Sequence, residues 1–135
     1  MIYTSYFAKL KSLPDNVIPI SICAKAPNWY KGIQYKKLAP KYGFFMKWKE
    51  DHDNDYYIEH FNLEVLEPLN ITSVLDDLQV SLPEEVKMKM QSPVWRNKDW
   101  HIALMCYEKP EDFCHRHLVA DWLVRNGISC EEYKF

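Results

Sequence analysis

The sequence predicts a single α/β domain of three layers, residues 1–135, with a mainly parallel sheet flanked by helices. The length of 135 residues is typical of one domain. The composition, 47% hydrophobic and 27% charged, is that of an ordinary globular protein. Two apolar runs, 17–23 and 102–107, are nearly continuous rather than alternating, which is typical of strands covered on both faces. Helical patterns separate the strands, and this order favours the α/β class.

Four runs have the length and composition of strands, at residues 2–6, 17–23, 102–107 and, more weakly, 128–130. Pro19 interrupts the second run, because proline cannot donate a ladder hydrogen bond. We therefore keep this strand but allow it to begin as late as Ile20.

Three segments have helical patterns. Asn70 is a good N-cap, and apolar residues follow it at helical spacing from Ile71 to Leu78. An earlier helix begins at the acidic residues 53–55 and ends before Pro68, and the last helix runs from residues 110–112 to Gly127. The stretch 83–100 reads as an irregular excursion. Because the middle helices follow one another without a strand, an α+β fold is the alternative.

The composition excludes several function classes. With three glycines, the chain has no phosphate-binding loop of the Gly-x-Gly-x-x-Gly or Walker type. A net charge of -2 gives no overall attraction to nucleic acid or to an anionic membrane. The sequence shows neither a leader-like start nor an apolar run near the ~20 residues of a membrane span, so we expect a cytoplasmic location and no membrane partner. In a reducing compartment, cysteines are more often buried, metal-bound or reactive than disulfide-bonded.

The chemistry is concentrated in residues 106–116, which run from the end of a buried strand through a turn into a helix. Ligands of open α/β sheets bind at this kind of edge. We expect a pocket bounded by the ends of strands 17–23 and 102–107 and by the helix start. Its candidate catalytic residues are Glu108 as acid or base, Cys114 as nucleophile and His115 as base. The base rate of buried cysteine favours the alternative of a half-buried structural residue for Cys114, and the alternative for His115, which faces the sheet, is a hydrogen-bonded core histidine.

Arg116 is the candidate ligand for a phosphate or carboxylate, because its planar guanidinium matches those groups. A structural salt bridge to Glu108 is the competing interpretation. Cys23 closes the second strand at the same edge and joins the candidate ligand-binding residues. No metal site and no cofactor are expected, since the chain has no Cys-x-x-Cys pair and His115 and His117 diverge on a helix.

A second feature is the segment 25–49, which contains seven lysines, seven aromatic residues and no acidic residue. Lysines neutralise phosphates and aromatic faces stack on bases, so this composition is typical of a nucleotide or single-strand binding surface. Lys25, Trp29 and Tyr30 are its candidate ligand-binding residues. The alternative is a solvated loop and helix whose aromatic residues belong to the core.

The stretch 102–123 resembles the signature of the domain-of-unknown-function family 488, an apolar strand ending in Cys-x-Glu followed by Cys-His-Arg on a helix. Cys106, Glu108 and residues 114–116 fill those positions. Where the family has Asp-Val-Arg at the end of its second strand, this chain has Ser-Ile-Cys at 21–23. If the missing arginine binds an anion in the family, either Lys25 takes its place or this branch binds a different ligand. The stretch around Trp29 is similar to a branch seen in phages and prophages.

The resemblance implies a small cytoplasmic α/β protein with a polar pocket but does not indicate a reaction. Two hypotheses about the function therefore remain open. In the first, the protein is an enzyme acting on a nucleotide-like molecule or on a nucleic acid. In the second, it is a non-catalytic binder of such a ligand, for example a phage protein that sequesters it.

Overall fold

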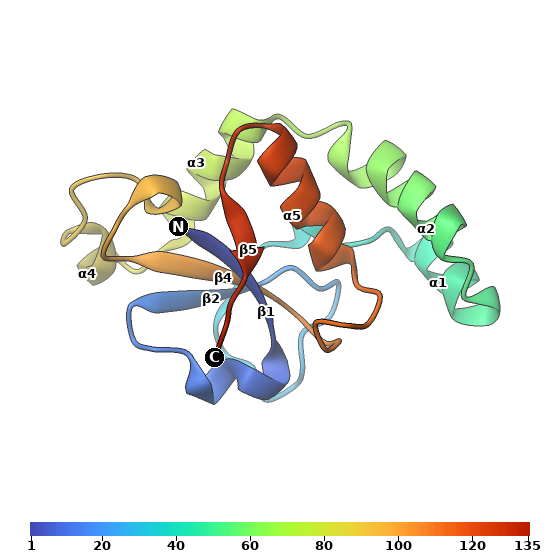
Figure 1. The fold of residues 1–135 in the computed structure, drawn as a ribbon, viewed down its shortest axis with the longest axis horizontal. Coiled ribbons are helices and arrows are strands. Elements are labelled where there is room, and N and C mark those ends of the chain that lie inside the picture. The colour runs from blue at the N-terminus through green and yellow to red at the C-terminus, as the bar shows by residue number, and fades with distance from the viewer.

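The computed structural model describes all residues from 1 to 135 and has one five-stranded sheet at its centre (Figure 1). The strands are β1 (Ile2–Tyr6), β2 (Val17–Ser21), β3 (Ile33–Gln34), β4 (His101–Cys106) and β5 (Cys130–Glu132). Their order across the sheet is β3-β2-β4-β1-β5, and every pairing is parallel. The predicted α/β class with a parallel sheet is confirmed.

The structure contains the three predicted helices and two that the sequence patterns do not indicate, at residues 42–51 and 84–87. They are α1 (Tyr42–Asp51), α2 (Asn54–Phe61), α3 (Ile71–Ser81), the single turn α4 (Glu84–Lys87) and α5 (His115–Arg125). Short 3-10 turns lie at Phe7–Ser12 (η1), Lys36–Leu38 and Val94–Arg96, and a π-helical turn at Asn62–Leu66 extends α2. No helix is long and apolar enough to span a membrane.

The handedness of the connections fixes which layer covers each face of the sheet. The connections from β3 to β4 and from β4 to β5 cross the sheet in one direction, while those from β1 to β2 and from β2 to β3 cross it in the other. Right-handed crossovers then place the α-helices on one face and η1, with the loop 22–32, on the other. In Figure 1, α3 and α5 lie above the strands and η1 lies below.

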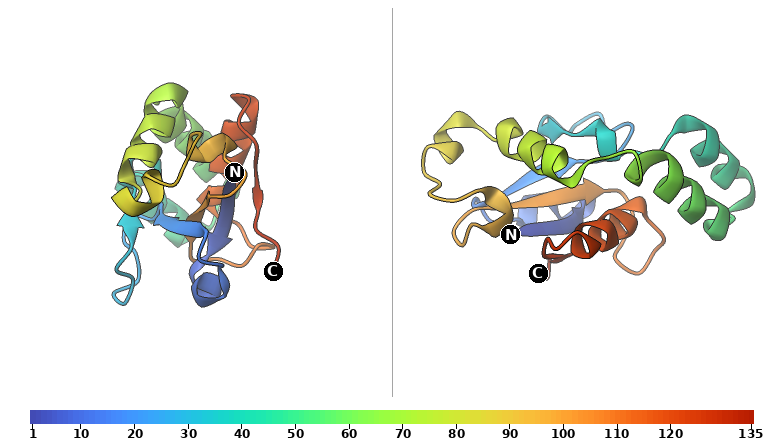
Figure 2. Two further views of the ribbon diagram at one scale, coloured as in Figure 1. Left: turned by 90° about the vertical axis from the view of Figure 1, so that its left-hand side faces the viewer. Right: turned by 90° about the horizontal axis from the view of Figure 1, so that it is seen from above.

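Successive side chains of β4 point to opposite faces of the sheet and pack into the core on each side. Ile102 and Leu104 pack into the core under the helices, and Ala103 and Met105 belong to a smaller cluster with Phe7 of η1. All four of these β4 residues have no exposed surface. Figure 2 (right) looks onto the helical face, with α3 over one edge and α5 over the other.

Several boundaries differ from the sequence expectation, each for a local reason. Strand β2 contains Pro19 because pairing with β3 begins only at Ile20, and the Pro19 carbonyl accepts a hydrogen bond from the Tyr30 hydroxyl instead. Helix α5 begins at His115 because residues 109–112 form a turn and Cys114 is an extended N-cap. Strand β3 has two residues, too few to show a pattern. The segment 83–100 is irregular apart from its two short turns.

Candidate functional site

The site lies where the carboxyl ends of β2 and β4 meet the first turn of α5. The two strands are paired in parallel, with Ser21 beside Met105, so the residues that follow them reach the same edge of the sheet. The α1–α2 hairpin extends beyond this end of the sheet (Figure 1). Residues from β4, α5 and α1 therefore surround one space.

His115 is fixed as a neutral base at the floor of this space. The side chain is buried, and its Nε2 lies 2.8 Å from the carbonyl oxygen of Ile22. A carbonyl only accepts hydrogen bonds, so Nε2 carries the proton and Nδ1 keeps a free lone pair. Burial lowers the pKa of His115 to about 4, although the bond to Ile22 opposes this change. The imidazole is thus neutral at pH 7 and able to accept a proton at Nδ1.

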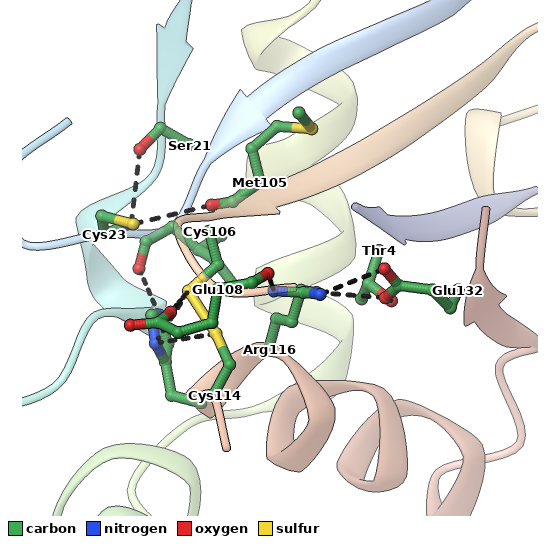
Figure 3. Close-up of a disulfide and its surroundings, with 11 residues drawn as sticks. Thr4, Ser21, Cys23, Met105, Cys106, Glu108, Cys114, Arg116 and Glu132 are labelled. Carbon is green, nitrogen blue, oxygen red and sulfur yellow. Dashed lines mark hydrogen bonds and ion pairs between the residues drawn. A yellow bond between two sulfur atoms is a disulfide. The ribbon is translucent and has the colours of Figure 1, made fainter. Parts of the chain in front are cut away.

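Cys106 and Cys114 lie beside that lone pair and are joined by a disulfide (Figure 3). The Nδ1 atom of His115 is 3.5 Å from Cys106 Sγ and 4.0 Å from Cys114 Sγ. The expectation that the cysteines are not disulfide-bonded is wrong for this pair. The parallel sheet brings the end of β4 and the N-cap of α5 together across eight residues of chain, which no spacing rule revealed.

Glu108 completes the group, with Oε2 at 3.3 Å from Cys106 Sγ. The ligating atoms of Cys106, Cys114 and His115 also lie within 4.8 Å of one another, so the reduced residues could hold a metal ion. The spacing of these donors along the chain is not that of a known zinc site, which is why the sequence predicts no metal there, but the fold brings His115 beside both cysteines. His117 donates nothing to this group, and its Nε2 is buried without a partner.

A cavity of about 390 Å³ opens in front of these residues. It lies at the edge where the sequence predicts the pocket. Its lining comes from the ends of β2 and β4, from the first residue of α5 and from α1: Cys23, Ala24, Lys25, Pro40, Phe45, Trp48, Lys49, Cys106, Tyr107, Glu108 and His115. Cys114, the predicted nucleophile, does not line this cavity but a neighbouring hollow of only about 30 Å³.

The wall opposite the floor is aromatic and positively charged. Trp48 and Phe45 of α1 are half-buried, with ring centroids 6.5 Å apart. The indole Nε1 of Trp48 donates to Asn54 at 2.7 Å, which fixes the ring. Lys25 and Lys49 are exposed at the rim, and the Lys49 ammonium lies 5.0 Å from the centre of the Phe45 ring. Lysine and aromatic side chains of the segment 25–49 therefore occur together at the cavity, Lys25 among them, and that they bind a ligand stays a prediction.

Arg116 does not line this cavity, contrary to the expectation that it binds an anion there. Its side chain has no exposed surface. Nε and Nη2 pair with the two carboxylate oxygens of Glu132 at 3.0 and 3.1 Å, and Nη1 donates to the backbone carbonyl of Glu108 at 2.7 Å. Figure 3 shows the guanidinium directed toward Glu132 and Thr4, away from the disulfide. Arg116 therefore forms a structural salt bridge, as the competing interpretation expects, but its partner is the carboxylate of Glu132 and not that of Glu108.

Trp29 and Tyr30 also lie away from the cavity, in a shallow hollow beside η1 and β2. Tyr30 is buried, and its hydroxyl donates to the carbonyls of Pro19 and Ile33, so it supports the sheet. Cys23 does line the cavity, but burial raises the pKa of its thiol to about 12. Cys23 is therefore a protonated wall residue rather than a reactive one.

Four residues that line the cavity are not among the site residues predicted from the sequence: Cys106, Phe45, Trp48 and Lys49. For Cys106 the signal was present, since it ends the buried strand and fills the first position of the family motif. Phe45, Trp48 and Lys49 lie in the segment 25–49, whose composition predicts a binding surface. Composition alone does not indicate which of its seven aromatic rings reach the cavity.

Together the parallel sheet and this edge define an α/β protein with a cysteine–histidine centre under a cationic, aromatic wall. The family model DUF488-N3a, described as the active DUF488-N3 subclade, matches residues 6–127. The chain therefore belongs to the DUF488-N3a family, in agreement with the resemblance noted from its cysteine, histidine and arginine motif. Comparisons with curated proteins and with solved structures found no match.

Proposed function

We propose that the protein is an enzyme that acts on a nucleotide-like ligand through the reduced thiol of Cys106. One observation carries the proposal: a single cavity combines Cys106, a neutral histidine base and Glu108 with two lysines and two neighbouring aromatic rings. A nucleophile beside a base that is oriented by a third group is the usual arrangement for nucleophilic catalysis. The description of the family as the active subclade supports catalysis.

The chemistry follows from the positions of the atoms. Nδ1 of His115 accepts the proton of the Cys106 thiol, and the Ile22 carbonyl stabilises the imidazolium that forms. The thiolate attacks an electrophilic carbon or phosphorus of the ligand, so that an S–C or S–P bond forms and the bond to the leaving group breaks. The imidazolium returns this proton to the leaving group. Water, whose proton passes to His115 or to the Glu108 carboxylate, then cleaves the thioester-like or thiophosphate-like intermediate, and that proton returns to the Cys106 sulfur as it leaves.

The ligand class follows from the wall. The ammonium groups of Lys25 and Lys49 bind phosphate, and Trp48 with Phe45 offers stacking surfaces to a base. A volume of about 390 Å³ lies within the range of small-ligand pockets. The ligand is thus a free nucleotide or one nucleotide of a nucleic acid, with a cytoplasmic location as the proposed setting.

The second candidate is a non-catalytic protein that binds or sequesters the same ligand. The disulfide favours it, because a Cys106 sulfur bonded to Cys114 is not a nucleophile while the cationic wall is unchanged.

The test is to incubate the reduced protein with pools of nucleotides and short nucleic acids and to identify both released and retained compounds by mass spectrometry. The proposal expects a converted product that disappears in Cys106→Ser and persists in the matched control Cys130→Ser. An unchanged ligand that is retained equally by all three proteins supports the binder. Conversion that survives in Cys106→Ser contradicts the role of Cys106.

A further inference from the structure

We propose that Cys106 and Cys114 form a reversible redox pair that a small thiol opens from the cavity, with Cys106 as the attacked sulfur and Cys114 as the resolving cysteine. Its consequence, control of catalysis by reduction, rests on the proposed function. The exchange reaction itself does not, and can be tested without knowing the substrate.

The first argument is access. Cys106 lines the cavity of about 390 Å³, which is large enough for a small thiol, whereas Cys114 faces the hollow of about 30 Å³. Phe113, Trp48 and Tyr57 line that smaller hollow. An attacking sulfur must approach in line with the S–S bond. The two residues are similarly buried, so it is the position of Cys106 on the larger cavity that favours attack there, with Cys114 as the leaving group.

The second argument is the fate of each sulfur after the bond opens. Cys114 is the N-cap of α5, an 11-residue helix whose first turn has no acidic residue. The helix dipole stabilises a departing thiolate at this end. No side chain caps the helix, and although the His117 N–H donates to the Cys114 carbonyl, the backbone N–H groups of His115 and Arg116 are available to that thiolate. Cys106 instead lies between His115 Nδ1 and Glu108, which exchange protons with it.

The third argument is that both ends of the bond are held by separate, rigid elements. Cys106 ends a strand that is paired on both sides, and its neighbour Glu108 is held by the buried Arg116 through the backbone carbonyl. Both sulfurs are thus kept close when the bond is open, and the disulfide reforms without a large movement.

The reaction balances with a low-molecular-weight thiol as reductant. A thiolate RS⁻ attacks Cys106 Sγ, an R–S–S–Cys106 bond forms, and Cys114 leaves as a thiolate. A second RSH reduces the mixed disulfide, which gives RSSR and the Cys106 thiol. Two electrons pass from two thiols to one disulfide, and the two protons of those thiols end on Cys106 and Cys114. The reverse reaction, with RSSR as oxidant, closes the pair and removes the nucleophile.

The experiment traps the intermediate with oxidised glutathione. Folded Cys114→Ser, whose fold is checked by circular dichroism, is expected to bind one glutathione at Cys106, located by peptide mass spectrometry. Cys106→Ser is expected to bind glutathione at Cys114 at least about ten times more slowly, because the cavity does not reach it. Cys130→Ser is the matched control and keeps the wild-type disulfide. Equal adduct formation at Cys106 and Cys114, or none at Cys106, overturns the proposal.

Two further measurements separate the alternatives. In the first, the wild-type protein is reduced with glutathione and alkylated under native conditions, and we expect labels at Cys106 and Cys114. A disulfide that resists reduction until the protein unfolds would contradict a redox pair. Reduced protein that retains one zinc ion through dialysis overturns the proposal in favour of a metal site at Cys106, Cys114 and His115. If the adducts form as expected and no nucleotide is converted, the redox pair stands and the proposed enzyme function fails.

Discussion

Replacing Arg116 by methionine is expected to lower stability strongly while leaving the cavity in place. Arg116 has no exposed surface and makes three hydrogen bonds, two to the Glu132 carboxylate and one to the Glu108 carbonyl. Methionine keeps much of the volume but leaves the Glu108 carbonyl without this donor and the Glu132 carboxylate with only the Thr4 hydroxyl. Breaking a buried ion pair from one side costs about 3–5 kcal/mol. The Glu132 side chain is 23% exposed, so water relieves part of this loss and we expect about 3 kcal/mol.

The measurement is urea denaturation of the reduced proteins. With a slope of about 2 kcal/mol per M, a loss of that size lowers the midpoint by roughly 1.5 M. Arg125→Met, at an exposed position of the same helix, is the control and should shift the midpoint little. In a double-mutant cycle with Glu132→Gln, the two losses should be far from additive, because both remove the same pair. A loss below about 1 kcal/mol for Arg116→Met, together with lost nucleotide affinity, would show that Arg116 is a ligand residue after all.

Two other outcomes test the histidine and the aromatic wall. The folded state holds His115 neutral with a pKa of about 4, below its ordinary 6.5, so the unfolded chain binds the extra proton and the free energy of unfolding falls between pH 6.5 and pH 4. We expect His115 to contribute on the order of 3 kcal/mol to this fall in the free energy of unfolding. Urea denaturation of the wild type and of His115→Gln at several pH values measures the contribution as the difference between them. Equal pH dependence of the two proteins would refute the assigned role of His115. Trp48→Ala should weaken nucleotide binding about ten-fold in equilibrium dialysis, since stacking on one base contributes about 1–3 kcal/mol, whereas Trp29→Ala, outside the cavity, should not. Equal effects of the two tryptophan variants would place the ligand elsewhere.

The sheet was predictable because its strands are buried on both faces, which leaves continuous apolar runs in the sequence. The edge that carries the site was predictable for the same reason, since polar side chains follow those runs. Strand β3 was not predictable, because two residues carry no periodicity and are held by their pairing with β2.

The roles within the motif were harder to predict than its location. Helical spacing predicts correctly that His115 faces the sheet. The same spacing places Arg116 on a flank of the helix and gives no sign of Glu132, because only the parallel pairing of β5 with β1 brings Glu132 beside Arg116. Thr4 on β1 holds the same carboxylate at 2.7 Å. The composition of residues 25–49 predicts a binding surface, yet of this segment only Lys25, Pro40 and part of α1 line the cavity, whereas Tyr30 is hydrogen-bonded to the sheet. These distinctions depend on tertiary contacts that a single sequence does not contain.

The rate at which each cysteine of the reduced, folded protein reacts with iodoacetamide tests the central claim, that Cys106 and His115 form the reactive centre. Burial raises the pKa of both Cys23 and Cys130 to about 12, so these two thiols are internal references for unreactive cysteines. Peptide-resolved mass spectrometry should find Cys106 modified at least about ten times faster than either at pH 7, and slower when a nucleotide is present. Modification of Cys23 or Cys130 as fast as Cys106, with no protection by nucleotide, would contradict the claim.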